Sequence, residues 1–515
     1  MRAPACDTRS RSRVASCRRR LDTSIHSATK LAYVHVMAAW ELALQVSPGD
    51  LPLFRQIANT IANDIVRGRL RPGTKLLSSR ALANQLGVSR NTVVTAYEEL
   101  CVEGWIAMEP ARGAFIVGVP SKPSATAPAT FPHAAGFDLA TSIPMHLPAP
   151  RTPGMLLLLS GVPELRDLPY RQLARAYRTA LSGRSARRLL DNAHPQGNLE
   201  LRIALAEMMS SLRGIAAPPD AITVVRGSQH GLYLAARALL RPGDVVAVEE
   251  LGYRPAWKAL ELAGATLVPV RVDGDGLDVA ALEALCATTH VRAIYTTPHH
   301  QYPSTVTLTS ARRAQLLALA ANRRMIVLED DYDHDFHYEG RPVLPLASAD
   351  RAGVVVYFGT LSKSLAPGLR LGYVVAAPDV VQQIAAYRSS FDGQGDHAVE
   401  RAVALLLEEG EVQRHVRRAL KAYRSRRDVL CAALHRRLPQ LELTVPAGGM
   451  GFWARAPGVD TDAWVRRGLD HGVAFQAGAQ FALDAAPSEY VRLGFSACDE
   501  AELEQAVERL VLALP

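Results

Sequence analysis

Phe358-Gly-Thr-Leu-Ser-Lys-Ser-Leu-Ala-Pro-Gly-Leu-Arg370 is the stretch that decides the fold. It places Lys363 just after an apolar run typical of a β-strand, beside small hydroxyl residues and seven positions before Arg370. A lysine amine forms an imine with an aldehyde, and hydroxyl and guanidinium groups bind phosphate. The stretch therefore predicts a site for an aldehyde-phosphate cofactor, and pyridoxal phosphate has that chemistry.

A second motif lies about thirty residues upstream, where the apolar run Met325–Leu328 continues into Glu329-Asp-Asp-Tyr332. Strand ends in open α/β sheets bring side chains to the ligand crevice, so Asp330 is predicted to bind the pyridinium nitrogen and keep it protonated. Tyr332 lies two residues on, on the same face of an extended chain, and is predicted to reach the phenolic oxygen of the cofactor ring.

A third motif is the turn Gly227-Ser-Gln229, between the strand pattern Ala221–Arg226 and a helix. Free backbone N–H groups at a helix start bind anions, so Ser228 and Gln229 are predicted to contact the phosphate. Each motif alone has a commoner explanation, because a Gly-Ser turn is usually a helix cap and an acidic strand end is usually solvated. Their order along one series of strands and helices is the stronger signal.

The same series contains Glu249-Glu-Leu-Gly-Tyr253 and Thr297-Pro-His-His-Gln-Tyr-Pro303 after two further strands. Together the motifs resemble the fold-type I aminotransferases over roughly residues 140–515. The resemblance implies that Lys363 forms the Schiff base with pyridoxal phosphate and that Tyr253 stacks on the cofactor ring. The residues that it assigns to the phosphate are Thr360, Ser362 and Arg370.

The resemblance also gives Arg492, in Tyr490-Val-Arg-Leu-Gly-Phe495, the role of binding the carboxylate of an effector, which suits a bidentate guanidinium. One motif departs from the family, which usually has Pro-Thr-Gly or Pro-Ser-Gly where this chain has Pro303-Ser-Thr305. A β-branched threonine resists the positive φ that glycine permits. For this reason no contact is assigned to His300 or Gln301.

The first quarter of the chain has a different pattern. Apolar residues recur at helical spacing over Leu53–Val66, and two short helices, Ser78–Leu86 and Arg90–Leu100, are joined by a tight turn with an N-cap serine. Two apolar runs within Glu103–Val117 then predict a hairpin wing. Residues 51–118 resemble the GntR-type winged helix, with its Ser-Arg-x-Leu-Ala and Val-Ser-Arg-x-Thr-Val signatures, although Leu77 stands where the family has proline.

The residues predicted to contact DNA follow from the geometry of this fold. The first residues of a recognition helix reach base edges in the major groove, and Arg90 is able to pair bidentately with guanine. Residues outside that helix are predicted to meet phosphates or the minor groove, with ordinary solvated surface as the alternative. The predicted set is Arg80, Arg90, Asn91, Thr92, Arg112 and Gly113.

The remaining pattern predicts a multi-domain chain. Strands alternate with helices from Val245 to Asn322, which predicts an α/β domain with a largely parallel sheet covered on both faces. Long helices and short strands after Ala398 predict a smaller α+β domain that closes over the cofactor. The expected divisions are a basic extension over 1–40, the winged helix over 41–118, a Pro/Ala/Ser-rich linker over 119–150 and the aminotransferase-like part over 151–515, split into a large domain of about 195–395 and a small domain of about 396–515.

Overall charge is a poor guide to function in this chain. The net charge is +8, but residues 1–36 alone contain eight Lys/Arg and two Asp, and the winged-helix region is close to neutral. DNA binding is therefore argued from placed residues. For residues 1–36 three interpretations are open: a basic arm that contacts DNA, a targeting peptide, or a segment that is not translated. We favour the third, with translation starting at Met37.

Cysteine spacing and hydropathy limit the remaining classes. The six cysteines show no paired spacing of the kind that metals or disulfide frameworks need, so no metal site is predicted. No apolar run has the length of a membrane span, and no membrane partner is predicted. We expect a reduced, cytoplasmic bacterial protein, associated with the nucleoid when bound to DNA.

A GntR-type winged helix joined by a proline-rich linker to an aminotransferase-like domain resembles the MocR family of bacterial transcription regulators, from about residue 40 onward. The resemblance implies pyridoxal phosphate on Lys363 and a small amino-containing effector that is sensed by imine exchange at this lysine. It also implies a homodimer, domain-swapped through the linker, on a double-stranded operator with paired half-sites.

The alternative is a catalytic aminotransferase that carries a DNA-binding domain. The residues of a half-reaction are all present, because a freed Lys363 is itself a proton shuttle, so the sequence leaves residual transamination open. A regulator without cofactor is disfavoured by the presence of Lys363, Asp330 and Arg370. The sequence does not identify the effector, the operator or the sign of regulation, and it does not place Arg254, Arg271 or Arg388.

Overall fold

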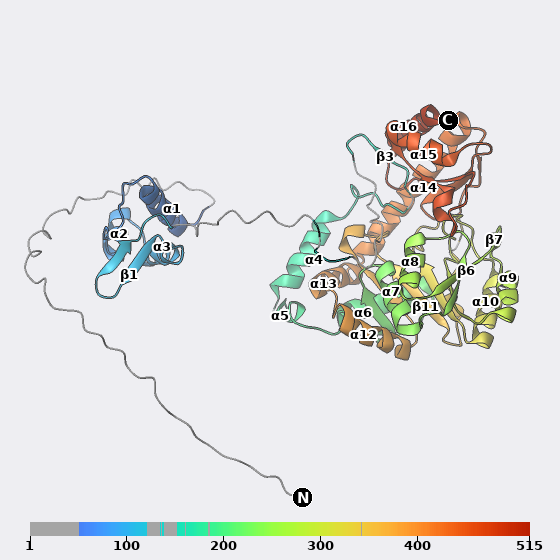
Figure 1. Cartoon of the computed structure of the whole chain (residues 1–515), viewed down its shortest axis with the longest axis horizontal. Coiled ribbons are helices and arrows are strands. Elements are labelled where there is room, and N and C mark those ends of the chain that lie inside the picture. Colours follow the sequence, from blue (N-terminus) through green and yellow to red (C-terminus); the bar gives the residue numbers. More distant parts are fainter. Residues whose placement is uncertain are drawn as a thin grey trace, which may run out of the picture. The chain divides into compact units, whose positions relative to one another are not determined.

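The computed structural model describes residues 51–120, 134, 136–138, 152–159, 161–183, 186–340 and 342–515. The predicted basic extension and most of the predicted linker lie outside the described residues. The chain divides into two compact units, Met1–Pro144 and Met145–Pro515, and each is described by itself (Figure 1).

The described residues of the first unit form three helices and a two-stranded wing, drawn in blue in Figure 1. Ser78 and Ser89 cap the second and third helices by accepting hydrogen bonds from the backbone N–H groups of Ala81 and Thr92. Gly87 ends the second helix at φ 64°, which glycine adopts without strain. The elements are α1 Leu53–Val66, α2 Ser79–Leu86, α3 Arg90–Val102, and the antiparallel pair β1 Ile106–Glu109 and β2 Gly113–Ile116.

Apolar residues at helical spacing form the core of this unit. Ile57 and Ile61 of α1, Leu82 of α2, and Val93 and Leu100 of α3 have no exposed surface. The winged helix-turn-helix expected from the sequence is confirmed.

A seven-stranded sheet is the centre of the second unit. Its strand order is β4-β12-β11-β10-β9-β5-β6, and only β12 runs antiparallel to its neighbours. The largely parallel sheet is therefore as expected. The strands are β4 Ile222–Val225, β5 Val245–Glu249, β6 Thr266–Val270, β9 Val291–Thr296, β10 Ile326–Asp331, β11 Val355–Thr360 and β12 Gly372–Val375.

Helices cover both faces of this sheet with two separate apolar cores. Buried residues of one core come from α4 Tyr170–Ser182, α6 Leu199–Arg213, α9 Val279–Thr288, α10 Ser310–Arg323 and α13 His397–Glu408. Those of the other come from α7 Ser228–Leu239, α8 Arg254–Leu262 and α12 Pro378–Phe391. Parallel strands need such cover because both of their faces are apolar.

A third core belongs to the smaller α+β part. It joins β14 Gly451–Arg455 and β17 Tyr490–Gly494 to α14 Glu411–Arg437, α15 Thr461–Asp470 and α16 Glu500–Ala513, which lie together in the orange and red part of Figure 1. Its sheet has the order β13-β14-β17-β16, with β13 Glu442–Leu443 and β16 Gln476–Ala477 at the edges. A separate parallel pair joins β3, Leu156–Leu157, to β15, Val473–Ala474.

The packing differs from the expected division near residue 396. Helix α13 contributes Ala402, Val403 and Leu406 to a core of the large sheet. Its length resembles that of the C-terminal helices, but its apolar face packs on α4 and α6. In addition, β3 belongs to the small part although it precedes the large sheet in sequence.

No helix of the described residues is long and apolar enough to cross a membrane.

Candidate functional site

A cavity of about 240 Å³ lies at the carboxyl ends of the parallel strands of the large sheet. In a parallel sheet these ends share one edge, so residues from distant motifs meet there. All nine residues predicted to contact the cofactor line it: Ser228, Gln229, Tyr253, Asp330, Tyr332, Thr360, Ser362, Lys363 and Arg370.

Lys363 enters the cavity from the turn that follows β11. Its Nζ donates a hydrogen bond of 2.6 Å to the carbonyl oxygen of Gly161. Burial lowers the pKa of Lys363 from 10.5 to about 8, because the ammonium form loses its hydration. The neutral amine, the form that attacks an aldehyde, is therefore much more populated near neutral pH than in an ordinary lysine, although it is still the minor form at pH 7.

Asp330 is held at the end of β10 by a tyrosine from the neighbouring strand. The hydroxyl of Tyr295 donates a hydrogen bond of 2.9 Å to Oδ2 of Asp330. Oδ1 is buried and has no hydrogen-bond partner among the described residues. Burial raises the pKa of Asp330 from 3.8 to about 7. This carboxylate is oriented but only half satisfied.

Three tyrosines form an aromatic group at the cavity. The rings of Tyr253 and Tyr302 meet edge to face with centroids 5.5 Å apart, and Tyr302 meets Tyr332 in the same way at 5.7 Å. Burial raises the pKa of Tyr253 to about 12, so its hydroxyl is neutral at physiological pH. The buried hydroxyl of Tyr332 makes no hydrogen bond within the described part of the chain.

The other end of the cavity combines the start of α7 with an arginine. Helix α7 begins at Ser228 without a side-chain cap, after Gly227 at φ 83°. Nη2 of Arg370 donates a hydrogen bond of 3.1 Å to the carbonyl oxygen of Arg226. A Cβ on Gly227 would lie 3.2 Å from that nitrogen, so glycine leaves the room in which the guanidinium sits. Backbone N–H groups and a cation thus converge as an anion site requires.

Arg492 lies beside the cavity but does not line it. It is fully buried in β17, and its guanidinium lies over the ring of Tyr302, 4.0 Å from the centroid. None of its three nitrogens makes a hydrogen bond to a described residue. The hydroxyl of Tyr332 interacts with the guanidinium but supplies no full charge, so this buried cation is suited to bind an anion.

Sequence reasoning missed several residues at the cavity. Gly161, Val162, Tyr295, Thr297, Tyr302 and Pro367 also line it. Gly161 is 202 residues from Lys363 in sequence, and no motif marks it. Tyr295 was detectable in principle, because it is the penultimate residue of β9, the strand that pairs with β10.

A second cavity of about 560 Å³ shares Tyr253 and Tyr302 with the first. Arg254 lines it and donates a hydrogen bond of 2.7 Å to the carbonyl oxygen of Ala482. Arg271 pairs with Asp278 and Arg388 binds the carbonyl oxygens of Pro195 and Val224, and neither lines this cavity or the first.

The turn that departs from the family pattern forms despite its threonine. Thr305 adopts φ 64°, and its N–H donates a hydrogen bond of 2.6 Å to the carbonyl oxygen of Gln301. Gln301 is buried and donates hydrogen bonds to the carbonyl oxygen of Leu251 and to Glu249. Thr305 thus adopts the left-handed conformation because the surrounding hydrogen bonds fix the turn.

The residues predicted to contact DNA lie on the surface of the first unit. Arg80, Arg90 and Asn91 are exposed, and Nε of Arg90 donates to Oγ of Ser79 at 3.4 Å. Thr92 is half-buried, with its hydroxyl 2.8 Å from that of Ser89.

The wing carries Arg112 in an ion pair. Its guanidinium bonds to Glu109 and lies 5.2 Å from the centroid of the Phe115 ring. Gly113 follows at φ 107°, beside the stem of Lys75. The wing arginine is therefore partly neutralised in the free protein.

Comparison with known proteins agrees with both halves of this structure. Residues 53–116 match the bacterial regulatory proteins of the gntR family, and residues 155–510 match aminotransferase class I and II. The fold and these matches define a DNA-binding regulator with an aminotransferase-like domain. The chain belongs to the MocR family of transcriptional regulators.

Two regulators match most of the chain, and a solved aminotransferase structure matches a smaller share of it. A probable rhizopine catabolism regulatory protein, MocR of Rhizobium meliloti, is 30% identical over 90% of this chain and 93% of its own length. The HTH-type transcriptional regulator TauR of Rhodobacter capsulatus is 32% identical over 90% of this chain and 97% of its own. The α-aminoadipate aminotransferase LysN of Thermus thermophilus, solved with N-(5'-phosphopyridoxyl)-L-leucine, superposes with a TM-score of 0.65 at 27% identity, covering 70% of this chain and 92% of LysN.

Pyridoxal phosphate is the cofactor of this class of domain, and the cavity fits it. The free Oδ1 of Asp330 suits a ring N–H, and the amine of Lys363 suits an aldehyde. The start of α7 together with Arg370 suits a phosphate.

Proposed function

We propose that this regulator senses a small amino compound that carries an acidic group, through the cofactor cavity, and changes its hold on operator DNA in response. The observation that carries the proposal is that the buried guanidinium of Arg492, whose nitrogens have no hydrogen bond of normal geometry to a described residue, lies beside the cavity that Lys363 lines. Bound pyridoxal phosphate supplies an aldehyde carbon that condenses with a primary amine and passes from one amine to another.

Each cavity residue has a distinct part in this proposal. Lys363 holds the cofactor covalently, Asp330 keeps a proton on the ring nitrogen, and Tyr253 stacks on the ring. Tyr332 hydrogen-bonds the phenolic oxygen. The residues proposed to hold the phosphate are Ser228, Gln229, Thr360, Ser362 and Arg370.

The effector's acidic group is proposed to bind Arg492. Tyr302 lines the cavity while its ring packs against the guanidinium, so a ligand reaching Arg492 from the cavity must displace or slide past that ring. The second cavity, shared through Tyr253 and Tyr302, offers the approach for such a ligand. Binding an anion there removes the unfavourable isolation of a buried charge.

The readout is proposed to pass through the small domain. Arg492 lies on β17 of the small sheet, whereas Lys363 follows β11 of the large one. An effector bound to both residues therefore links the large and small parts. It shifts the equilibrium between two arrangements of these parts by the difference between its binding free energies for the two. The wider proposal is a homodimer, domain-swapped through the linker, on paired half-sites in the cytoplasm, with Arg80, Arg90, Asn91, Thr92, Arg112 and Gly113 at the DNA.

The test follows the visible absorbance of the purified protein while amines and amino acids are added, with operator binding measured on the same samples by fluorescence anisotropy. The proposal expects one compound to shift the cofactor band lastingly and to change operator affinity. Arg492→Lys is expected to weaken the response to that compound while the cofactor band without effector persists. A compound that shifts the band equally in the Arg492 variant would contradict the role of this arginine.

A second candidate is a catalytic aminotransferase, favoured by the lowered pKa of Lys363, which suits an amine that carries protons. It predicts a different result in the same experiment. The band would then disappear on adding an amino acid and return on adding a 2-oxo acid.

A further inference from the structure

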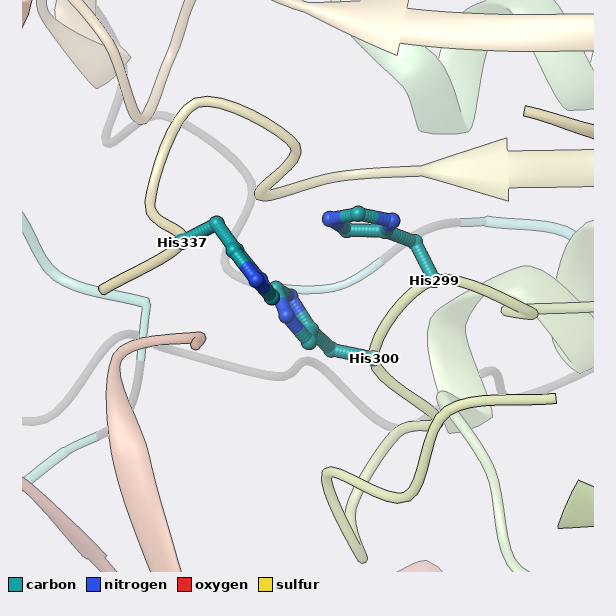
Figure 2. A group of neighbouring side chains, drawn as sticks. All are labelled: His299, His300 and His337. Atoms are coloured by element: carbon teal, nitrogen blue, oxygen red, sulfur yellow. The ribbon is translucent and has the colours of Figure 1, made fainter. Parts of the chain in front are cut away.

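Four histidine rings gather in the loops that follow β9 and β10. The ring centroid of His299 lies 4.2 Å from that of His300, 4.7 Å from that of His334 and 5.9 Å from that of His337. Figure 2 shows that His299 and His300 come from one loop and His337 from another, with the three rings close together. No part of the proposed sensing mechanism uses these side chains.

Three of these rings bring nitrogen atoms close to one another. His299, His300 and His337 each have one ring nitrogen within 4.8 Å of the other two. Both nitrogens of His299, Nε2 of His300 and Nδ1 of His337 are buried and make no hydrogen bond to any described residue. Buried polar atoms in proteins are nearly always satisfied, so this many free nitrogens in one place call for a ligand.

Asp333 orients the middle histidine. Its Oδ1 lies 2.9 Å from Nδ1 of His300, and both side chains are buried. A carboxylate on one nitrogen fixes the tautomer and leaves the lone pair of the other nitrogen free, which is the usual arrangement behind a metal-binding histidine. Gly448 leaves room beside that free nitrogen, because a Cβ at this position would overlap Nε2 of His300.

We propose that His299, His300 and His337 form a binding site for a divalent transition-metal ion of the zinc type. Imidazole nitrogens favour zinc, cobalt, nickel and copper over the hard ions magnesium and calcium. Three nitrogens with one open position match the three-ligand class of zinc sites. The proposal stands apart from effector sensing, because it uses none of the residues that line the cofactor cavity.

The geometry asks for a modest closure of the rings. Zinc–nitrogen bonds of about 2.0–2.1 Å place two nitrogens of a tetrahedral site about 3.3 Å apart, against up to 4.8 Å here. His337 is half-buried whereas His299 and His300 are fully buried, so His337 forms the open side from which an ion arrives.

A bound ion would join two loops that also carry cavity residues. His300 is two residues before Tyr302, and Asp333 directly follows Tyr332. His337 additionally forms a β-bridge with Gly448 of the small part. The ion would therefore fasten the edge of the cavity at the point where the two parts of the second unit meet.

The test uses the full-length protein with its cofactor and without a histidine tag. It is stripped with a chelator, equilibrated with zinc chloride and desalted, and the metal per chain is measured by mass spectrometry. Cobalt(II) chloride serves as a spectroscopic probe of tetrahedral nitrogen coordination. We expect one zinc per chain and strong visible cobalt bands, both lost in His337→Gln, and roughly 10- to 100-fold weaker binding in Asp333→Asn.

The matched control is His290→Gln, which changes an exposed histidine at the opposite end of β9 and should bind zinc like the unchanged protein. Far-UV circular dichroism reports whether each variant is folded. If His337→Gln does not fold, Asp333→Asn still tests the site. Absence of retained zinc in the unchanged protein would overturn the proposal. So would equal retention in folded His337→Gln and Asp333→Asn, which would place the ion elsewhere, for example at Cys431 and His435.

Discussion

The hydroxyl of Tyr295 donates a 2.9 Å hydrogen bond to one oxygen of Asp330, while the other oxygen has no partner within the described residues. Strand pairing produces this relationship, because β9 and β10 are neighbours in parallel register. The free oxygen is thus presented in a fixed direction before any ligand arrives. Pre-orientation of this kind reduces the entropy cost of ordering the carboxylate when a ligand binds.

Tyr295→Phe is expected to weaken cofactor binding. A hydrogen bond to a charged group contributes about 1.5–3 kcal/mol, and this one is already present in the cofactor-free protein, so its loss predicts a Kd for pyridoxal phosphate that is raised by less than the corresponding factor of roughly 10 to 100. Equilibrium dialysis with absorbance detection measures it. The control is Tyr357→Phe, which removes a similar buried hydrogen bond to Asp331 away from the cavity and should leave the Kd unchanged.

Asp330 is expected to make the cofactor-free protein less stable as the pH rises. Burial raises its pKa from 3.8 to about 7, so the folded chain keeps a proton that the unfolded chain releases earlier. The stabilisation by that proton is complete below about pH 4 and is lost as the pH rises through about 7, at about 1.4 kcal/mol per unit. The Tm of the cofactor-free protein should therefore fall more than that of Asp330→Asn between about pH 5 and about pH 8. Parallel curves would show that this carboxyl does not titrate as described.

The rate of covalent cofactor attachment should depend on the protonation of Lys363. Only the neutral amine attacks an aldehyde, and burial lowers the pKa of this lysine to about 8. Stopped-flow absorbance is expected to show a rate that rises about tenfold per pH unit below that value and levels off above it. A rate that continues to rise towards the ordinary lysine pKa would contradict the burial effect, and Lys363→Ala should show no attachment.

Arg80→Ala is expected to change the salt dependence of operator binding. One lost phosphate contact lowers the slope of log affinity against log salt by about one. Anisotropy titrations at several salt concentrations measure the slope. Arg351→Ala, which removes an exposed arginine of the second unit, serves as the control, and an identical slope in both variants would exclude the contact.

Glu109→Gln is expected to strengthen DNA binding. Glu109 pairs with Arg112 in the wing, so a phosphate must compete with this carboxylate for the guanidinium. An exposed pair of this kind is worth about 0.2–1 kcal/mol, which predicts a gain of up to about fivefold in operator affinity at low salt. If Arg112 does not contact DNA, the same gain should remain in the background Arg112→Ala, and that outcome would refute the assignment.

Local motifs predicted much of the fold because each carried its own physical signal. The N-cap serine at Ser89 marked the start of α3, and the alternation of apolar strands with helices indicated the parallel sheet. The cavity residues in the motifs around Lys363, Asp330 and Gly227 were predictable, because the carboxyl ends of parallel strands meet at one edge of the sheet.

What the sequence did not reveal depends on long-range packing. Gly161 reaches Lys363 from a segment with no motif, and α13 looks like its C-terminal neighbours although its apolar face packs on α4 and α6. The four histidines lie in two loops about 35 residues apart, and only the adjacency of β9 and β10 brings them together. Thr305 shows the opposite error, since a local conformational preference was overruled by the hydrogen bonds around it.

The parallel pair of β3 and β15 makes the chain cross its own domain boundary twice. In sequence order, the second unit forms one strand of the small part at Leu156–Leu157, then the whole large sheet, and then the rest of the small part. The small part is therefore no detachable C-terminal module. A chimera that joins the second unit to another DNA-binding domain must place its junction before Leu156, and a deletion meant to remove only the small part would leave β3 without its partner strand.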